Sequence, residues 1–198
     1  MIKSDHSHYG KPLIMLYPGE HIVSSEDIVV STVAGSCLVV TLNDNKRNIG
    51  GIAHFILPGQ IGTGGITHDD VASYGITQLE YLFGEFVKKG GRREDLTADV
   101  FGAAALDVNK KINEAIQRSN INFIHSFFSA EHIPVRTLDL AGSVRRKIVY
   151  FPKTGKTYRK MLNHNEDNSE IIRLEHEYIK KAFKELREQT QYIIFNEK

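Results

Sequence analysis

The stretch that decides the fold is Ile28-Val-Val-Ser-Thr-Val-Ala-Gly-Ser-Cys-Leu-Val-Val-Thr-Leu42. It contains two runs rich in β-branched residues, separated by the small residues Ala34-Gly35-Ser36. Such runs are typical of buried strands, and the small residues between them allow a tight turn. A third run of this kind extends from Ile49 to Leu57 after a polar turn, and Pro58 ends it. The stretch and its continuation predict three consecutive strands.

The chain beyond this stretch mixes helical and strand patterns as far as residue 162. Apolar residues recur at three- and four-residue intervals over 71–89 and 109–131, which predicts two helices. Further strands are predicted at 96–101, 135–140, 147–151 and 156–161, and the glycine-rich segment 59–70 is predicted to be a loop. Strands outnumber helices and do not alternate strictly with them. We therefore expect an α+β fold.

Residues 163–198 have a different pattern. The polar segment from Asn163 to Ser169 has the composition of a linker, and an amphipathic helix is predicted from Ser169 to Gln189. An isolated helix of this length is marginal in water, so its apolar stripe must pack against the chain's own body or against a partner. We expect a single domain over 1–162 with a linker and helical extension over 163–198. The stripe consists of Ile171, Leu174, Tyr178, Ala182, Phe183 and Leu186.

The composition excludes several classes of function. The 198 residues carry 25 Lys and Arg against 24 Asp and Glu, and this net charge of +1 supplies no basic stripe for nucleic acid. A single cysteine excludes an internal disulfide framework and a cysteine-only zinc site, and it suits a reducing compartment. The polar first residues lack the apolar core of a signal peptide, and no stretch suits a membrane-spanning helix. We expect a cytoplasmic protein that is not embedded in a membrane and does not bind nucleic acid.

Short motifs give no reason to expect a metal or a cofactor. The run Thr154-Gly-Lys-Thr157 resembles the end of a phosphate-binding loop, but the glycine that this motif requires five positions before Gly155 is Tyr150. His6 and His8 have no cysteine or acidic partner at ligand spacing. We therefore expect neither a metal site nor a cofactor site.

Cys37 and His54 are the residues that can carry chemistry. Each of them, taken alone, is more often a buried core residue than a catalytic one. His54 follows Cys37 by 17 residues (54 − 37) and lies in the next predicted strand. A hairpin-like pairing of 37–42 with 49–57 would bring the two side chains together. A thiol whose proton is taken by a neighbouring imidazole is a nucleophile at neutral pH.

Segments around these residues form an ordered pattern: Ser31-Thr-Val-Ala-Gly-Ser-Cys37, then Gly51-Ile-Ala-His-Phe-Ile-Leu-Pro58, then Val100-Phe-Gly-Ala-Ala104. The pattern closely resembles the chemoreceptor glutamine deamidase family, CheD, in which a hydroxyl residue precedes a G-S-C and an A-H-x-x-L-P follows. Later segments resemble the family too, namely His132-Ile-Pro-Val135, Asp139 with Gly142 and Arg146, and Phe151-Pro152 with Gly155. The resemblance covers about residues 10–161.

The chain departs from the family pattern at several positions. The family has Thr at the first hydroxyl position, where this chain has Ser31 followed by Thr32, so the orienting hydroxyl is one or the other. The family's F-G-G-A is Phe101-Gly-Ala-Ala104, its G-G is Ala141-Gly142, and its I-G-x-R-N is Ile116-Gln-Arg-Ser-Asn120. The last three changes bear on substrate fit more than on the chemistry of the thiol.

The resemblance implies a layered α/β/β sandwich that hydrolyses selected glutamine side chains to glutamate on the cytoplasmic helices of chemoreceptors. Related proteins also act on methyl esters at such sites and bind the chemotaxis phosphatase CheC. The resemblance implies Cys37 as nucleophile, His54 as its base and Ser31 as the hydroxyl that orients the imidazole. Backbone N–H groups near Gly35 and Ser36 are candidate oxyanion donors.

Two other functions compete with deamidation of receptors. A non-catalytic adaptor would bind CheC or a receptor through the same fold and leave Cys37 inert. A generic cysteine amidase would act on small molecules. An adaptor needs neither a nucleophile nor a base, which favours an enzyme. A change of about +1 Da at glutamine in a treated receptor fragment would separate the three.

Overall fold

The computed structural model describes residues 2–4, 9–55, 68–106 and 110–162, together with Arg173 and Glu177. The described strands form two sheets. The first has the order β1-β2-β4-β9-β10 and consists of β1 (Ile2–Ser4), β2 (Leu13–Met15), β4 (Val29–Ala34), β9 (Arg146–Phe151) and β10 (Lys156–Met161). The second has the order β3-β6-β5-β7-β8 and consists of β3 (His21–Ser24), β6 (Ile49–Phe55), β5 (Leu38–Asp44), β7 (Leu96–Gly102) and β8 (Val135–Leu140).

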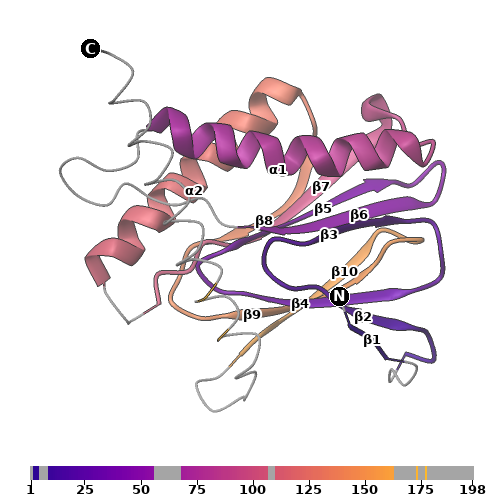
Figure 1. Cartoon of the computed structure of the whole chain (residues 1–198), viewed down its shortest axis with the longest axis horizontal. Helices are drawn as coiled ribbons and strands as arrows, with labels where there is room; N and C mark the ends of the chain where they lie inside the picture. Colours follow the sequence, from indigo (N-terminus) through magenta and orange to yellow (C-terminus); the bar gives the residue numbers. More distant parts are fainter. Residues whose placement is uncertain are drawn as a thin grey trace.

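The described helices α1 (His68–Lys88) and α2 (Lys110–Glu131) lie on one face of the second sheet, and the first sheet lies against its other face (Figure 1). Apolar residues of the two helices, such as Leu82 and Ile124, share a core cluster with Val40 and Leu42 of β5. A second cluster between the sheets joins Val39 to residues of β4 and β9. The second sheet is therefore the central layer.

The position of β5 and β6 in the central layer explains their sequences. Every residue of both strands is buried. A strand that is covered on both faces needs apolar residues at successive positions, because alternation alone would place polar side chains in a core. This is why the continuous run from Leu38 to Leu42 forms a strand. The polar end of β5 is accommodated by hydrogen bonds, since Asn43 accepts one from the Tyr150 hydroxyl at 2.6 Å.

The expected α+β class is confirmed as a mixed arrangement of two helices and two sheets among the described residues. The predicted pairing of 37–42 with 49–57 is present as the antiparallel pair β5 and β6, and β9 pairs with β10 as a hairpin. The short strands β1, β2 and β3 were not predicted from the sequence. Helix α1 begins at His68, inside the segment expected to be a loop. The linker and most of the predicted helix of 163–198 lie outside the described residues.

No helix in the described part of the chain is long and apolar enough to cross a membrane.

Candidate active site

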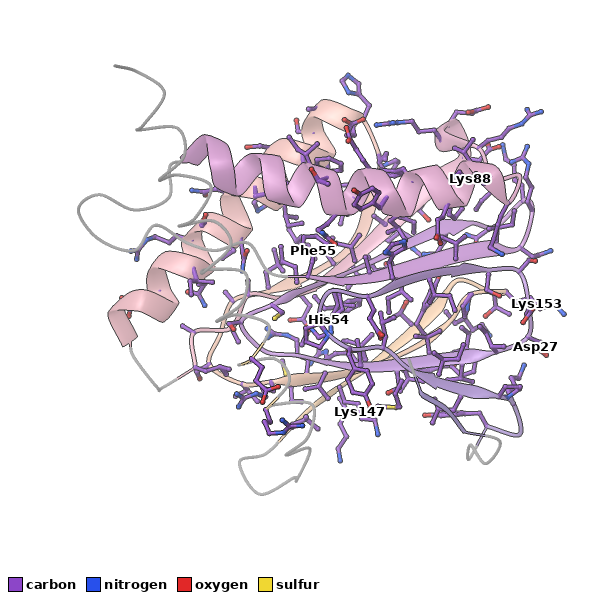
Figure 2. The ribbon with its side chains drawn as sticks, in the orientation of Figure 1. Asp27, His54, Phe55, Lys88, Lys147 and Lys153 are labelled. Atoms are coloured by element: carbon purple, nitrogen blue, oxygen red, sulfur yellow. The ribbon has the colours of Figure 1, made fainter. Side chains whose placement is uncertain are left out.

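His54 lies near the end of β6 and points into the space between the two sheets. Side chains alternate along a strand, so His54 shares its face with Ile52, which belongs to the cluster between the sheets. Phe55 packs on the helix side. Figure 2 shows the two neighbours on opposite sides of the strand. The backbone of His54 is held by hydrogen bonds to Gly19 and Glu20, at 2.7 and 3.0 Å. These two hydrogen bonds fix the backbone position from which the imidazole side chain extends.

Thr32 of β4 holds the imidazole of His54 from the opposite sheet. Its Oγ1 lies 2.8 Å from Nδ1 of His54 and donates to the carbonyl of Leu16 at 2.7 Å. Because the single hydroxyl proton of Thr32 is used on Leu16, the hydroxyl accepts from the imidazole, and Nδ1 carries the ring proton. Nε2 then presents its lone pair. It is buried and has no hydrogen-bond partner among the described residues.

Burial lowers the pKa of His54 from its usual 6.5 to about 3, and a hydrogen bond to the Leu16 backbone offsets only part of this effect. The side chain is fully buried, and an imidazolium there would lose its hydration. The ring is therefore neutral at neutral pH, with Nε2 able to accept a proton.

Cys37 lies at the point where the chain passes from the first sheet to the second. The strand β4 ends at Ala34 and β5 begins at Leu38 in the other sheet. Cys37 directly precedes Leu38, the first residue of β5, and Leu38 and Val39 pair with Phe55 and His54 of β6. The backbones of Cys37 and His54 therefore lie at the same end of this strand pair. Cys37 is fully buried.

Of the two hydroxyls that the sequence left open, the structure places that of Thr32 and not that of Ser31 against the imidazole of His54. Ser31 Oγ donates to the carbonyl of Ile148 at 3.2 Å, whereas the hydroxyl on the imidazole belongs to Thr32. Adjacent residues of a strand face opposite ways, and Val30 and Ala34 belong to the cluster between the sheets. Thr32 therefore points inward and Ser31 outward. The sequence alone could not choose between the two hydroxyls, because the face of β4 that meets the other sheet is known only from the structure.

The turn Gly35–Cys37 is held by hydrogen bonds from the two residues that follow β7. The carbonyl of Gly35 accepts from Ala104 N at 2.8 Å, and the carbonyl of Cys37 accepts from Ala103 N at 2.9 Å. Gly102 passes so close that a Cβ on it would collide with the Cys37 carbonyl oxygen, and its φ is +118°. Only glycine fits this position.

Two alanines next to this turn have left-handed backbones. Ala103 has φ 50° and Ala141 has φ 70°. Both stand where the family pattern has glycine. Ala141 N donates to the Gly102 carbonyl at 3.1 Å, so both residues belong to the backbone network beside the cysteine. An L-residue in this conformation costs roughly 1–2 kcal/mol.

A family model described as CheD chemotactic sensory transduction matches residues 56–161, which is more than half of the chain. The chain belongs to the CheD family. The matched range begins just after His54 and includes Asn120.

Curated CheD relatives match over most of this chain. A protein named "Probable chemoreceptor glutamine deamidase CheD" from Burkholderia vietnamiensis is 36% identical over 79% of this chain and 63% of its own length. A CheD 1 protein of the same description from Albidiferax ferrireducens is 37% identical, over 81% and 66%. A relative from Cupriavidus pinatubonensis is 36% identical, over 83% and 76%. The chain thus spans less than two thirds of the length of the first two.

Asn120 of α2 also contacts the site, and this contact was not predicted from the sequence. Its Nδ2 donates to the carbonyl of Ser36 at 2.8 Å, and the side chain is fully buried. One turn earlier, Gln117 donates to the carbonyls of Ala103 and Gly142, at 3.0 and 3.3 Å. The signal was a polar residue on the buried face of an amphipathic helix, which needs a partner. The partner lies 84 residues away and is invisible in the sequence.

Proposed function

We propose that this chain is a protein-glutamine glutaminase that converts glutamine side chains to glutamate on cytoplasmic helices of chemoreceptors. The observation that carries the proposal is the state of His54. Its Nδ1 is held by Thr32, its Nε2 has no partner among the described residues, and Cys37 directly precedes the strand that pairs with its own. A thiol beside an oriented neutral imidazole is the pair that nucleophilic amide hydrolysis requires. The names of the curated relatives support the same substrate.

The first half-reaction forms a thioester. Nε2 of His54 takes the proton of the Cys37 thiol as the sulfur attacks the carboxamide carbon of glutamine. A carbon–sulfur bond forms, and the carbonyl electron pair moves onto oxygen. The tetrahedral intermediate then collapses, the imidazolium returns its proton to nitrogen, and ammonia leaves. The chain is left as a thioester with His54 neutral.

The second half-reaction hydrolyses the thioester. His54 takes a proton from water as the water oxygen attacks the acyl carbon, and the carbon–sulfur bond breaks. The sulfur regains its proton, and glutamate is released. Each turnover consumes one glutamine side chain and one water and gives one glutamate and one ammonia. No electron leaves or enters, so the cycle requires no oxidant or reductant.

A pKa near 3 makes His54 a neutral base rather than half of a resting ion pair. Proton transfer from Cys37 is then coupled to attack on the substrate. Thr32 keeps the proton on Nδ1 and so keeps the lone pair on Nε2. We assign the orienting role to this hydroxyl. A hydroxyl adds no charge, so Thr32 affects only the orientation and the tautomer of the His54 imidazole.

Backbone N–H groups near Gly35 and Ser36 are our proposed donors to the oxyanion. The carbonyls of Gly35 and Cys37 are held by Ala104 and Ala103, which fixes the planes of the peptide units in this turn. Fixed peptide dipoles stabilise a developing charge without reorganising during the reaction.

The remaining partners follow from the same resemblance. We propose that the protein acts in the cytoplasm, that receptor helices are its substrates, and that a CheC-type phosphatase binds it. The near-neutral charge of the chain favours these protein partners over nucleic acid.

The test is mass spectrometry of a receptor cytoplasmic fragment incubated with the full chain or with the Cys37→Ala variant. The expected result is a gain of about 1 Da at particular glutamines with the parent protein alone, accompanied by stoichiometric ammonia. Binding of the fragment without a mass change would favour the adaptor, and ammonia release from free glutamine alone would favour a small-molecule amidase. Either outcome would overturn the proposal.

A further inference from the structure

The hydrogen bond from Asn120 to Ser36 acts on the peptide unit of the nucleophile. The carbonyl of Ser36 and the N–H of Cys37 belong to one planar group. A donor on that carbonyl, here Nδ2 of Asn120 at 2.8 Å, fixes the plane of the group and therefore the direction of the Cys37 N–H. It also polarises the peptide, so that the positive end of the dipole at Cys37 becomes stronger.

Two of the carbonyls in the turn Gly35–Cys37 accept hydrogen bonds from backbone groups, and the third accepts one from a side chain. The carbonyls of Gly35 and Cys37 accept from the backbone N–H groups of Ala104 and Ala103. The carbonyl of Ser36 accepts from a side chain of another layer of the fold. Backbone donors come with the strand, whereas a side-chain donor depends on the residue at position 120. The middle peptide of the turn is therefore the one that substitution can release.

Burial makes this contact strong. Asn120 is fully buried and Ser36 is nearly so. A buried carbonyl that loses its donor carries the full desolvation cost of that group, which favours a different arrangement of the turn. A new arrangement would move the thiol relative to His54.

We propose that Asn120 is a positioning residue that holds the Cys37 nucleophile and its N–H in the reactive geometry through the Ser36 carbonyl. This inference rests on the proposed deamidation. It assigns to α2 a role in catalysis in addition to its role in the core. Asn120 does not touch the reacting atoms and acts only through the peptide that precedes the sulfur.

Two replacements of Asn120 separate positioning from packing. Asn120→Leu removes the donor at similar volume. Asn120→Asp removes it only while the new carboxyl is ionised, because a protonated carboxyl can donate its O–H to the Ser36 carbonyl. Burial beside a carbonyl oxygen raises the pKa of such a carboxyl, so donation returns as the pH falls. The leucine variant has no such recovery.

The matched control is Asn43→Asp. Asn43 is also a buried asparagine, at the other end of β5 from the turn, and it accepts a hydrogen bond from Tyr150. This change perturbs the interior of the same sheet without touching the Ser36–Cys37 peptide. We expect its kcat to stay within about twofold of the parent.

The measurements are kcat and KM for a receptor fragment from about pH 6 to 8.5, on full chains whose folding is checked by circular dichroism. At the upper pH we expect kcat to fall by roughly 10–100-fold in both Asn120 variants, with KM within about threefold. The ratio of kcat between Asn120→Asp and the parent should rise at least about fivefold toward the lower pH. The same ratio for Asn120→Leu should stay flat. Unchanged kcat, a loss in KM alone, or identical pH profiles of the two variants would refute the inference.

A second readout keeps the inference testable if the parent protein does not deamidate receptors. The midpoint of the alkylation rate of Cys37 against pH reports the stability of the thiolate. It should rise by roughly half a pH unit or more in Asn120→Leu and stay in place in Asn43→Asp. An unchanged midpoint would refute the positioning role, whereas an inactive parent with a shifted midpoint would refute only the proposed reaction. If Asn120→Leu does not fold, the comparison of Asn120→Asp with the parent decides alone.

Discussion

Acid should destabilise the folded protein through His54 before it protonates the paired carboxylates. The folded-state pKa is about 3 and the unfolded value is 6.5. The folded chain therefore keeps the imidazole neutral while the unfolded chain takes up a proton below pH 6.5. The unfolded state binds more protons in this window, so stability rises with pH, is fully present above pH 6.5 and is lost as the pH falls toward 3.

The size of the effect follows from the shift. Each pKa unit corresponds to about 1.36 kcal/mol. The unfolded imidazole is already half protonated at pH 6.5, so lowering the pH from 6.5 to about 4.5 should cost about 2.3 kcal/mol from this one group. The carboxyls of Asp44 and Asp95 have pKa values below the usual 3.8. For Asp44, burial raises the pKa, but hydrogen bonds from Arg47 and Arg92 together outweigh it. For Asp95, hydrogen bonds from Lys46 and Arg47 lower it. Their contributions are lost only at lower pH. The interval between about pH 6.5 and 4.5 therefore isolates the histidine.

The assay is urea denaturation of the parent, His54→Gln and His125→Gln at several pH values between about 7.5 and 4.5. Glutamine does not titrate, so the His54 variant should lose about 3 kcal/mol less over this range than the parent. The exposed His125 serves as the control, and its variant should follow the parent. Equal pH dependence of the parent and His54→Gln would refute the burial argument.

The other predictions concern the site, its backbone and the tail. Cys37→Ala and His54→Ala should each abolish deamidation with the fold intact, and the double variant should be no worse, because the pair acts as a unit. Residual activity in folded Cys37→Ala would contradict the thiol mechanism. Thr32→Val should lower kcat by roughly 10–100-fold, as is common for groups that orient a catalytic residue. Ser31→Ala should leave kcat nearly unchanged, and the reverse ranking of these two would contradict the Nδ1 assignment. Ala103→Gly and Ala141→Gly should leave the free energy of unfolding within about 1 kcal/mol of the parent, because relief of the left-handed strain offsets the added chain entropy. Ala98→Gly, within β7, should destabilise by about 1 kcal/mol or more, and equal losses in calorimetry would show that the strain is absent. A chain ending near Asn165 should still deamidate but melt at a lower temperature, and complete unfolding would make the tail integral to the core.

Strands and turns of sufficient length could be predicted because their residue patterns depend only on neighbours along the chain. The β-branched runs of 28–42 and the turn before Ile49 predicted β4, β5 and β6, and the pairing of β5 with β6 was predicted as well. The short strands β1, β2 and β3 were missed because segments of three or four residues carry too little periodicity to be detected.

The contacts between layers were not predictable from the sequence. The difference between Ser31 and Thr32 depends on which face of β4 meets the other sheet. The partner of Asn120 depends on where α2 crosses the turn before Cys37. Both facts arise from the docking of distant segments, for which a single sequence holds no periodic signal. The sequence shows which residue types are present, but it does not show which of them contact one another.

The three layers each supply one part of the site. Thr32 comes from the first sheet, His54 from the second and Asn120 from the helices. Under the proposed mechanism the site is complete only when all three layers are docked on one another. Deamidation would then report on the tertiary packing of the whole domain, because separating any one layer from the others would remove one of these contacts.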